Sequence, residues 1–571
     1  MKLFLIDALG PFCGQLPRGR QNWSKIPFSQ LAGPADAHCD SSWQAITADM
    51  HTFVQRVRSA GYNAITLDDL AHLTNHPLHD ATTNQLIDFY REKFRPLIQL
   101  AIDAGLKVFL TSDIITLSES ARIQLENQPA RIEEFYIDQL ESCLADFPEL
   151  SGIILRIGES DGLDVKDPLK SQLHLKSAKQ TNRFLKAILP SFEKHNKQLI
   201  LRTWTVGAHR IGDLIWHRGT LNKALLGISS PQFILSMKYA ESDFFRYLSI
   251  NQAFTQSPLA KIVEFQARRE YEGAGEFPSF IGWDCQRYRE QLAHVENLIG
   301  LSVWCQTGGW HAFRRRAFLE PAGIWTEINA KTIIDIFRHE SSAEESLERQ
   351  FGQEKSASVI ELMRLTNQLI LKLYYIEPFA RQPLYFRRVR IPPLLHIYWD
   401  SLLITVPVRK LMRHFVSNHS ETLRDGQLAL ELAEETPTLA NDAGLPAEDI
   451  EFMLDTCRLI QLARQFYFSE LNDGLNQQIQ LAKKAYKKKY PRKQRQRFRI
   501  NTDFSPSQLK SRHLAMASRY LLRSQRKYRW LDHLFTLHLL SIGYQLLKPS
   551  SQEKLPKALR DSAMGVDSLF K

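Results

Sequence analysis

Long apolar runs are absent from this sequence of 571 residues. The longest candidates, residues 401–408 and 530–547, are too short or too polar to cross a membrane, which takes about 20 mostly apolar residues. The first residues carry one lysine and a short apolar run that Asp7 interrupts. They lack the longer apolar stretch and the small-residue cleavage site of a signal peptide. The sequence therefore predicts no membrane segment.

Cysteine pairs are also absent. The six cysteines are scattered, with no C-x-x-C pair and no histidine at a spacing suited to zinc. They are Cys13, Cys39, Cys143, Cys285, Cys305 and Cys457. We interpret them as free thiols in a reducing cytoplasm and expect no metal. No glycine-rich phosphate loop follows any predicted strand, so nothing indicates a nucleotide, and we expect no cofactor.

Acidic residues are missing from one stretch, residues 483–499. Ten of its seventeen residues are basic, which accounts for nearly all of the net charge of +11. Such a block can contact nucleic acid or another anionic polymer. Because Pro491 interrupts it, we favour a solvated helix end followed by a loop. Nucleic acid is therefore not an expected partner.

What the sequence does have, up to about residue 325, is a regular alternation of strand-like apolar runs and helical patterns. This alternation is typical of βαβ units around a parallel sheet. Helical patterns such as residues 50–61, 94–105 and 131–147 separate the runs. The eight candidate strands lie at residues 3–9, 63–69, 107–113, 152–158, 198–204, 232–238, 261–266 and 301–306. Eight strands favour a closed (β/α)8 TIM barrel of the α/β class over an open sheet.

Beyond about residue 326 the pattern changes to long helices with little β-type alternation. Residues 356–376, 449–468 and 513–541 show this most clearly. The length also fits more than one domain. We therefore predict three parts, which are a catalytic barrel at residues 1–325, a mostly α-helical C-terminal domain at 326–548 and a flexible tail at 549–571.

Three carboxylates, Glu159, Asp243 and Glu264, follow or close three of the predicted strands. A TIM barrel builds its active site from the carboxyl ends of its strands, so these side chains are expected at one mouth. Cleaving a glycosidic bond takes one protonated carboxyl for the leaving oxygen and one ionised carboxylate to direct water or attack carbon. The three residues indicate a carbohydrate-active enzyme whose partner is an oligosaccharide substrate.

Two motifs around these carboxylates resemble glycoside hydrolase family 67, the α-glucuronidases. Residues 238–244 match the family pattern K-x-x-x-x-D-F, with Lys238, Asp243 and Phe244 at its fixed positions. Residues 264–273 match E-F-Q-x-x-x-E-Y-x-G at every fixed position, and this is the more specific motif. The similarity extends from about residue 90 to residue 345.

The resemblance implies roles for the acidic residues. Glu159 corresponds to the general acid, while Asp243 and Glu264 would activate a water molecule on the opposite face of the sugar. The anomeric carbon would then be inverted, and which of the two carboxylates takes the proton stays open. The family also suggests, as a hypothesis, a homodimer formed through the helical domain.

Cationic and aromatic residues extend the predicted site. Arg202 and Lys238 match cationic positions beside the family's acids, and they suggest a substrate with a uronic-acid carboxylate. A salt bridge to the catalytic acids is the other interpretation of both residues. Trp204, Trp304 and Trp310 are candidates for stacking on sugar faces.

The chain also departs from the family. Family members begin with a β-rich domain, whereas this sequence begins at its first predicted barrel strand. The family's lysine four residues before the acid is Leu155 here, and Arg156 follows as a candidate replacement. These differences indicate a divergent relative with an altered substrate.

Two alternatives stay open. A retaining glycosidase of a neutral glycan would use Glu159 as acid and base and Glu264 as nucleophile, although such enzymes usually have an asparagine where Gly158 stands. A non-catalytic protein that binds a glycan or a polyanion is the other alternative.

Overall fold

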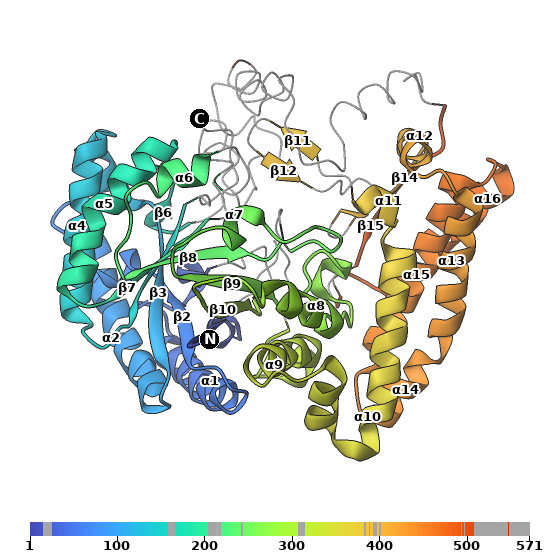
Figure 1. Ribbon diagram of the computed structural model, residues 1–571, viewed down its shortest axis with the longest axis horizontal. Coiled ribbons are helices and arrows are strands. Elements are labelled where there is room, and N and C mark those ends of the chain that lie inside the picture. Colours follow the sequence, from blue (N-terminus) through green and yellow to red (C-terminus); the bar gives the residue numbers. More distant parts are fainter. Residues whose placement is uncertain are drawn as a thin grey trace.

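Eight parallel strands close into a barrel in the computed structural model (Figure 1). The order around the barrel is β1-β10-β9-β8-β7-β5-β3-β2, and β10 closes it by pairing with β1. The strands are β1 (Leu3–Asp7), β2 (Ala64–Asp68), β3 (Lys107–Asp113), β5 (Gly152–Arg156), β7 (Gln198–Arg202), β8 (Phe233–Lys238), β9 (Lys261–Gln266) and β10 (Leu298–Trp304). The predicted TIM barrel is thereby confirmed.

The structure describes most of the chain. The described residues are 1–14, 25–157, 166–203, 214, 219–240, 244–306, 315–381, 384–386, 389–391, 397–398, 401–492, 494–495, 497–506 and 546. All six cysteines are free thiols. In these ranges no helix is long and apolar enough to cross a membrane.

Helices cover the outside of the barrel, and amphipathic faces put their apolar residues against the strands. They are α1 (Cys39–Ser59), α2 (Ala81–Asp103), α3 (Glu119–Leu125), α4 (Pro129–Asp146), α5 (Ala178–Lys194), α6 (Thr220–Ala224), α7 (Gln252–Thr255), α8 (Gly282–Leu292) and α9 (Ile324–Arg338). The side chains of Asp80, Ser118 and Ser177 cap the N-termini of α2, α3 and α5. A hairpin of β4 (Thr116–Ser118) and β6 (Leu169–Ser171) also belongs to this half of the chain.

Side chains alternate between the two faces of each barrel strand. One face packs under the helices, and the other forms an apolar layer inside the barrel. That inner layer consists of Leu3, Leu5, Ala64, Phe109, Ile154, Ile200, Ile234 and Ile262. Two positions further along β5, β7 and β9 the inward residues are Arg156, Arg202 and Glu264. Strand periodicity therefore places charged groups at the carboxyl-end mouth.

The C-terminal half is mainly helical, as predicted, and lies beside the barrel (Figure 1). Its helices are α10 (Ala343–Leu369), the π-helix Ile370–Tyr374, α11 (Glu377–Ala380), α12 (Val406–Phe415), α13 (His419–Leu432), α14 (Thr436–Ala443), α15 (Ala447–Phe468) and α16 (Asp473–Lys489). It also contains the short strands β11 (Leu384–Phe386), β12 (Val389–Ile391), β13 (Ile397–Tyr398), β14 (Ser401–Thr405) and β15 (Arg499–Asp503). Sequence patterns missed these strands, and β14 pairs in parallel with β15, almost a hundred residues later.

Helix α9 joins the two halves. Ile333 and Phe337 belong to the apolar core of the barrel, whereas Trp325 and Ile328 belong to the core of the helical region. The Trp325 indole donates to Asp449 at 2.7 Å, a buried polar contact between α9 and α15. The domain boundary predicted at residue 325 therefore falls at the start of α9, a helix that contributes to both cores. The division of the chain into domains stays a prediction.

The basic block at residues 483–499 begins on α16. Lys487, Lys488 and Lys489 occupy its last turn, where the helix dipole favours positive charge. Lys489 pairs with Asp455 at 2.6 Å, and Arg495 pairs with Asp449 at 2.6 Å. Part of the block therefore makes intramolecular ion pairs.

Candidate active site at the barrel mouth

Glu264 lies at the centre of the charged mouth, at the carboxyl end of β9, with 1% of its surface exposed. The Arg202 side chain on β7 donates from Nε at 3.1 and 3.2 Å and from Nη2 at 2.8 Å. The Ser236 hydroxyl on β8 donates at 2.6 Å. Lys238 is the register partner of Glu264 on β8. Strands β7 and β8 thus supply the hydroxyl and the cations beside this carboxylate of β9.

These neighbours decide the charge of Glu264. Burial alone would raise its pKa, but the Arg202 ion pair, the Ser236 hydrogen bond and the charge of Lys238 outweigh burial and hold the pKa below its usual value. The carboxylate is therefore ionised at neutral pH. Such a group can act as a base or as a nucleophile, but it has no proton to donate.

Two aromatic rings pack against the cations beside Glu264. The Arg202 guanidinium lies over the Trp304 ring at 4.1 Å, and the Lys238 ammonium lies over the Phe244 ring at 4.6 Å. The Trp304 indole N–H is buried and has no acceptor among the described residues. The structure thus brings Arg202, Lys238 and Trp304 together with Glu264. We call this group, with Ser236, the Glu264 half of the mouth.

Four other predicted site residues lie outside the described residues. They are the candidate acids Glu159 and Asp243 and the candidate stacking residues Trp204 and Trp310. Their roles stay predictions. Ser236 was missed by the sequence analysis, although its position two residues before Lys238 on the same strand face could have revealed it.

Arg156 also lies at the mouth of the barrel, but its partners are aspartates of β2 and β3 and not Glu264. Its Nε donates to Asp113 on β3 at 2.8 Å, and its Nη2 is 3.6 Å from Asp68 on β2. Lys25 also pairs with Asp113, at 2.5 Å. Leu155 packs in the layer under the helices, so strand alternation makes Arg156, and not Leu155, the inward residue of β5. Its role in substrate binding stays a prediction.

A buried histidine extends this acidic network. The two ring nitrogens of His72 contact Asp69 at 2.6 Å and Asp167 at 3.1 Å, and the ring stacks on Phe28 at 3.8 Å. Burial alone would lower the pKa of His72, but the two carboxylates raise it to about 10. His72 is therefore a cation at neutral pH, and it holds the loop after β2 to the segment before β6.

Two further aspartates end the first two strands. Asp7 accepts hydrogen bonds from the backbone N–H groups of Cys305 and Gln306, and burial raises its pKa to about 7. Asp68 accepts from the backbone N–H of Ile26 at 2.6 Å, and burial raises its pKa to about 6. Both carboxylates tie loops together around the mouth.

We call the group at the ends of β1, β2, β3 and β5 the aspartate half of the mouth. It comprises Asp7, Asp68, Asp69, His72, Asp113 and Arg156. The sequence analysis did not single out its acids, although Asp7, Asp68 and Asp113 close apolar runs as Glu264 does. The described residues contain no group of three or more His, Cys, Asp or Glu side chains placed to hold a metal ion.

No protein-family model matches the chain, and no curated protein matches it. Similar solved structures include a GH138 enzyme targeting pectin rhamnogalacturonan II, at 12% identity over 86% of this chain and 76% of that chain, with a TM-score of 0.47. A Thermobaculum terrenum O-GlcNAc hydrolase mutant is similar at 10% identity over 82% and 90%, with a TM-score of 0.38. A beta-mannanase from the blue mussel Mytilus edulis is similar at 13% identity over 60% and 94%, with a TM-score of 0.33. These scores carry no functional argument, and the resemblance to family 67 rests on its two motifs.

Proposed function

We propose that this protein is a glycoside hydrolase and that Glu264 is one of its catalytic carboxylates. The observation that supports this best is the buried, ionised Glu264 at the carboxyl end of β9, held by Arg202 and Ser236 beside Trp304. Active sites of TIM barrels lie at this end. Glycoside hydrolysis needs an ionised carboxylate on one side of the sugar, and the lowered pKa of Glu264 at the barrel mouth supports this role.

The second carboxyl group of the reaction would be Glu159, acting as general acid. In an inverting reaction, Glu264 with Asp243 would activate water. In a retaining reaction, Glu264 would attack the anomeric carbon itself. We favour inversion because the family motifs supply two carboxylates for the water side. Proton NMR of the first-formed anomer distinguishes the two, since retention would make Glu264 the nucleophile.

We further propose that the substrate carries a uronic acid, as the family motifs imply. Arg202 already donates hydrogen bonds to Glu264 from Nε and Nη2. Lys238, on the strand beside Glu264, is the second cation that could bind the substrate carboxylate.

The direct test measures reducing ends released from oligosaccharides that carry a uronic acid, beside matching neutral oligosaccharides. We expect activity on the uronides, and loss of that activity in Glu264→Gln. Lys238→Ala should reduce activity on a uronide more than on its neutral counterpart. Equal effects on both substrates would contradict the acidic substrate and leave the glycosidase proposal standing. A lack of cleavage of every glycan would contradict the glycosidase proposal.

A further inference from the structure

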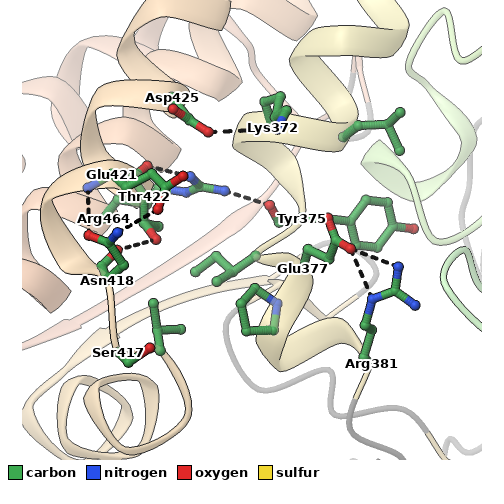
Figure 2. Close-up of a pocket in the computed structure, with 14 residues that line it drawn as sticks. Lys372, Tyr375, Glu377, Arg381, Ser417, Asn418, Glu421, Thr422, Asp425 and Arg464 are labelled. Atoms are coloured by element: carbon green, nitrogen blue, oxygen red, sulfur yellow. Dashed lines mark hydrogen bonds and ion pairs between the residues drawn. The ribbon is translucent and has the colours of Figure 1, made fainter.

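A pocket of about 410 Å³ lies in the helical region (Figure 2). Its walls come from the π-helix and the chain that follows it and from the start of α13, and α15 supplies Arg464. Exposed side chains such as Lys372 and Glu421 form the rim, whereas Arg464 is 2% exposed. The pocket therefore has a buried guanidinium at its base.

Arg464 is a buried cation without a matching carboxylate. Its Nη1 donates to the carbonyl of Thr422 at 3.0 Å, and its Nη2 donates to the carbonyl of Tyr375 at 2.5 Å (Figure 2). Within the described part of the chain, Nε has no hydrogen-bond partner and no carboxylate oxygen lies within 4 Å of the guanidinium. Backbone carbonyls orient the group, but they do not neutralise its charge.

Burial lowers the pKa of Arg464 to about 10, so the group still carries its charge at neutral pH. A buried charge without a counter-ion is costly, and an anion that enters the pocket removes that cost. Arginine is also well suited to bind carboxylate and phosphate, because its planar N–H groups match two oxygens at once.

The charged side chains on the rim are two cations and three carboxylates, and two pairs of opposite charge form among them. Lys372 lies 3.6 Å from Asp425, and Arg381 makes two hydrogen bonds to Glu377, at 2.7 and 2.9 Å. The remaining rim carboxylate, Glu421, accepts a hydrogen bond from the Asn418 amide. Among the residues that line the pocket, Arg464 is therefore the cation without an ion pair, and Glu421 is the carboxylate without one.

The start of α13 adds a second favourable contribution. Asn418 caps this helix of 14 residues by accepting from the backbone N–H of Glu421, and Ser417 and Thr422 also line the pocket. The N-terminus of a helix carries partial positive charge and attracts anions. The guanidinium and the helix terminus thus favour the same kind of ligand.

We propose that this pocket binds a small oxyanion, a carboxylate or a phosphate, through Arg464. The site is separate from the mouth of the barrel and does not depend on the proposed hydrolysis. The same chemistry could come from a sugar acid or from a phosphorylated compound, and the choice of probe distinguishes these sources.

The test is isothermal titration calorimetry on the full chain at constant ionic strength. The probes are inorganic phosphate and D-glucuronate, with D-glucose as the neutral control. Saturable binding of phosphate alone would identify a phosphate site, and binding of glucuronate would extend the site to sugar acids. Glucose should not bind here. If neither anion bound, the proposal would be wrong.

Two pairs of variants locate the binding. Arg464→Met should weaken anion binding at least about tenfold, because charge-assisted hydrogen bonds are lost. Arg413→Met is the control for the loss of one arginine, since Arg413 is exposed, donates to the backbone carbonyl of Phe468 and does not line the pocket. Glucuronate binding that survived in Arg464→Met would be assigned to the barrel mouth and would contradict its assignment to this pocket.

The second pair keeps the test valid if Arg464→Met does not fold. Ser417 is exposed on the rim, so Ser417→Glu adds a negative charge without touching the buried guanidinium. We expect Ser417→Glu to weaken anion binding several-fold and Ser417→Gln to preserve it. Equal affinities in the two variants would exclude an anion in this pocket.

Discussion

Glu264 in one half of the barrel mouth and the pair Asp7 and Asp68 in the other half have opposite pKa shifts. In the Glu264 half, one carboxylate is surrounded by an arginine, a hydroxyl and a lysine, and its pKa lies below its usual value. In the aspartate half, several carboxylates lie close together, and burial raises the pKa of Asp7 to about 7 and of Asp68 to about 6. The neighbours of each carboxylate, more than its place at a strand end, indicate its role. An ionised Glu264 fits the catalytic role proposed for it, whereas Asp7 and Asp68 accept backbone hydrogen bonds that join loops.

The largest expected difference is in activity. Under the proposed function, Glu264→Gln should lower kcat/KM by roughly 10²–10⁴-fold, the usual contribution of a catalytic acid or base, and by more if Glu264 is a nucleophile. Asp68→Asn is the matched control in the other half, and we expect a loss below about tenfold, because Asp68 holds the Ile26 backbone. Steady-state kinetics on a cleaved uronide measure both variants. A larger loss in Asp68→Asn would reverse the assignment of the two halves.

Removal of the Glu264 partner should reduce stability. Arg202→Met leaves a buried carboxylate without its ion pair, which costs about 3–5 kcal/mol in comparable cases. The control is Arg183→Met, because Arg183 pairs with Glu133 while its side chain is 58% exposed, and such pairs are worth about 0–1 kcal/mol. Urea unfolding followed by circular dichroism gives both values. Similar losses in the two variants would show that the Arg202 pair adds no special stability.

The aspartate half should make stability depend on pH through His72. Because its folded pKa of about 10 lies above the usual 6.5, protonated His72 stabilises the fold fully below pH 6.5, and this contribution disappears as the pH rises through 10. His72→Gln should therefore cost roughly 2–4 kcal/mol near pH 6 and less near pH 10. Urea unfolding at several pH values tests this. A cost that did not change with pH would show that His72 is not charged in the folded state.

The smallest expected effect concerns Ser236. Its hydroxyl gives Glu264 a hydrogen bond of 2.6 Å, so Ser236→Ala should cost about 1 kcal/mol and raise the pKa of Glu264 slightly. Ser302→Ala is a useful control, because Ser302 is the register partner of Glu264 on the other neighbouring strand, β10. The measurement is the pH dependence of kcat/KM on the acid side. Equal shifts in the two variants would show that any substitution near Glu264 has this effect, and that the Ser236 hydrogen bond is not its cause.

Much of the barrel could be predicted from sequence because its signals are local. Each strand is a short apolar run between helical patterns, and the chain order of these runs is also their order around the barrel. The pairing of β14 with β15 joins residues almost a hundred positions apart, and no local pattern encodes it. Long helices were found in the C-terminal half because their periodicity is local. Strands β11, β12 and β13 have only two or three residues, which is too short for a recognisable alternation.

The candidate site shows a similar limit. Motifs identified Arg202, Lys238 and Glu264, but they did not show whether Arg202 would face a substrate or Glu264. That choice depends on the register of β7, β8 and β9, which brings residues 62 positions apart into contact. The contact of His72 with Asp167 spans 95 positions and was likewise hidden.

Under the proposed function, Arg202 keeps Glu264 ionised for catalysis. The most direct test is the pH dependence of kcat/KM on a cleaved substrate, for the unsubstituted protein and for Arg202→Met. We predict that the acid limb of the unsubstituted protein lies below the usual glutamate value of 4.5 and moves to higher pH in Arg202→Met, because the buried carboxyl then gains its proton more easily. An acid limb that stays at the same pH in both proteins would contradict the claim.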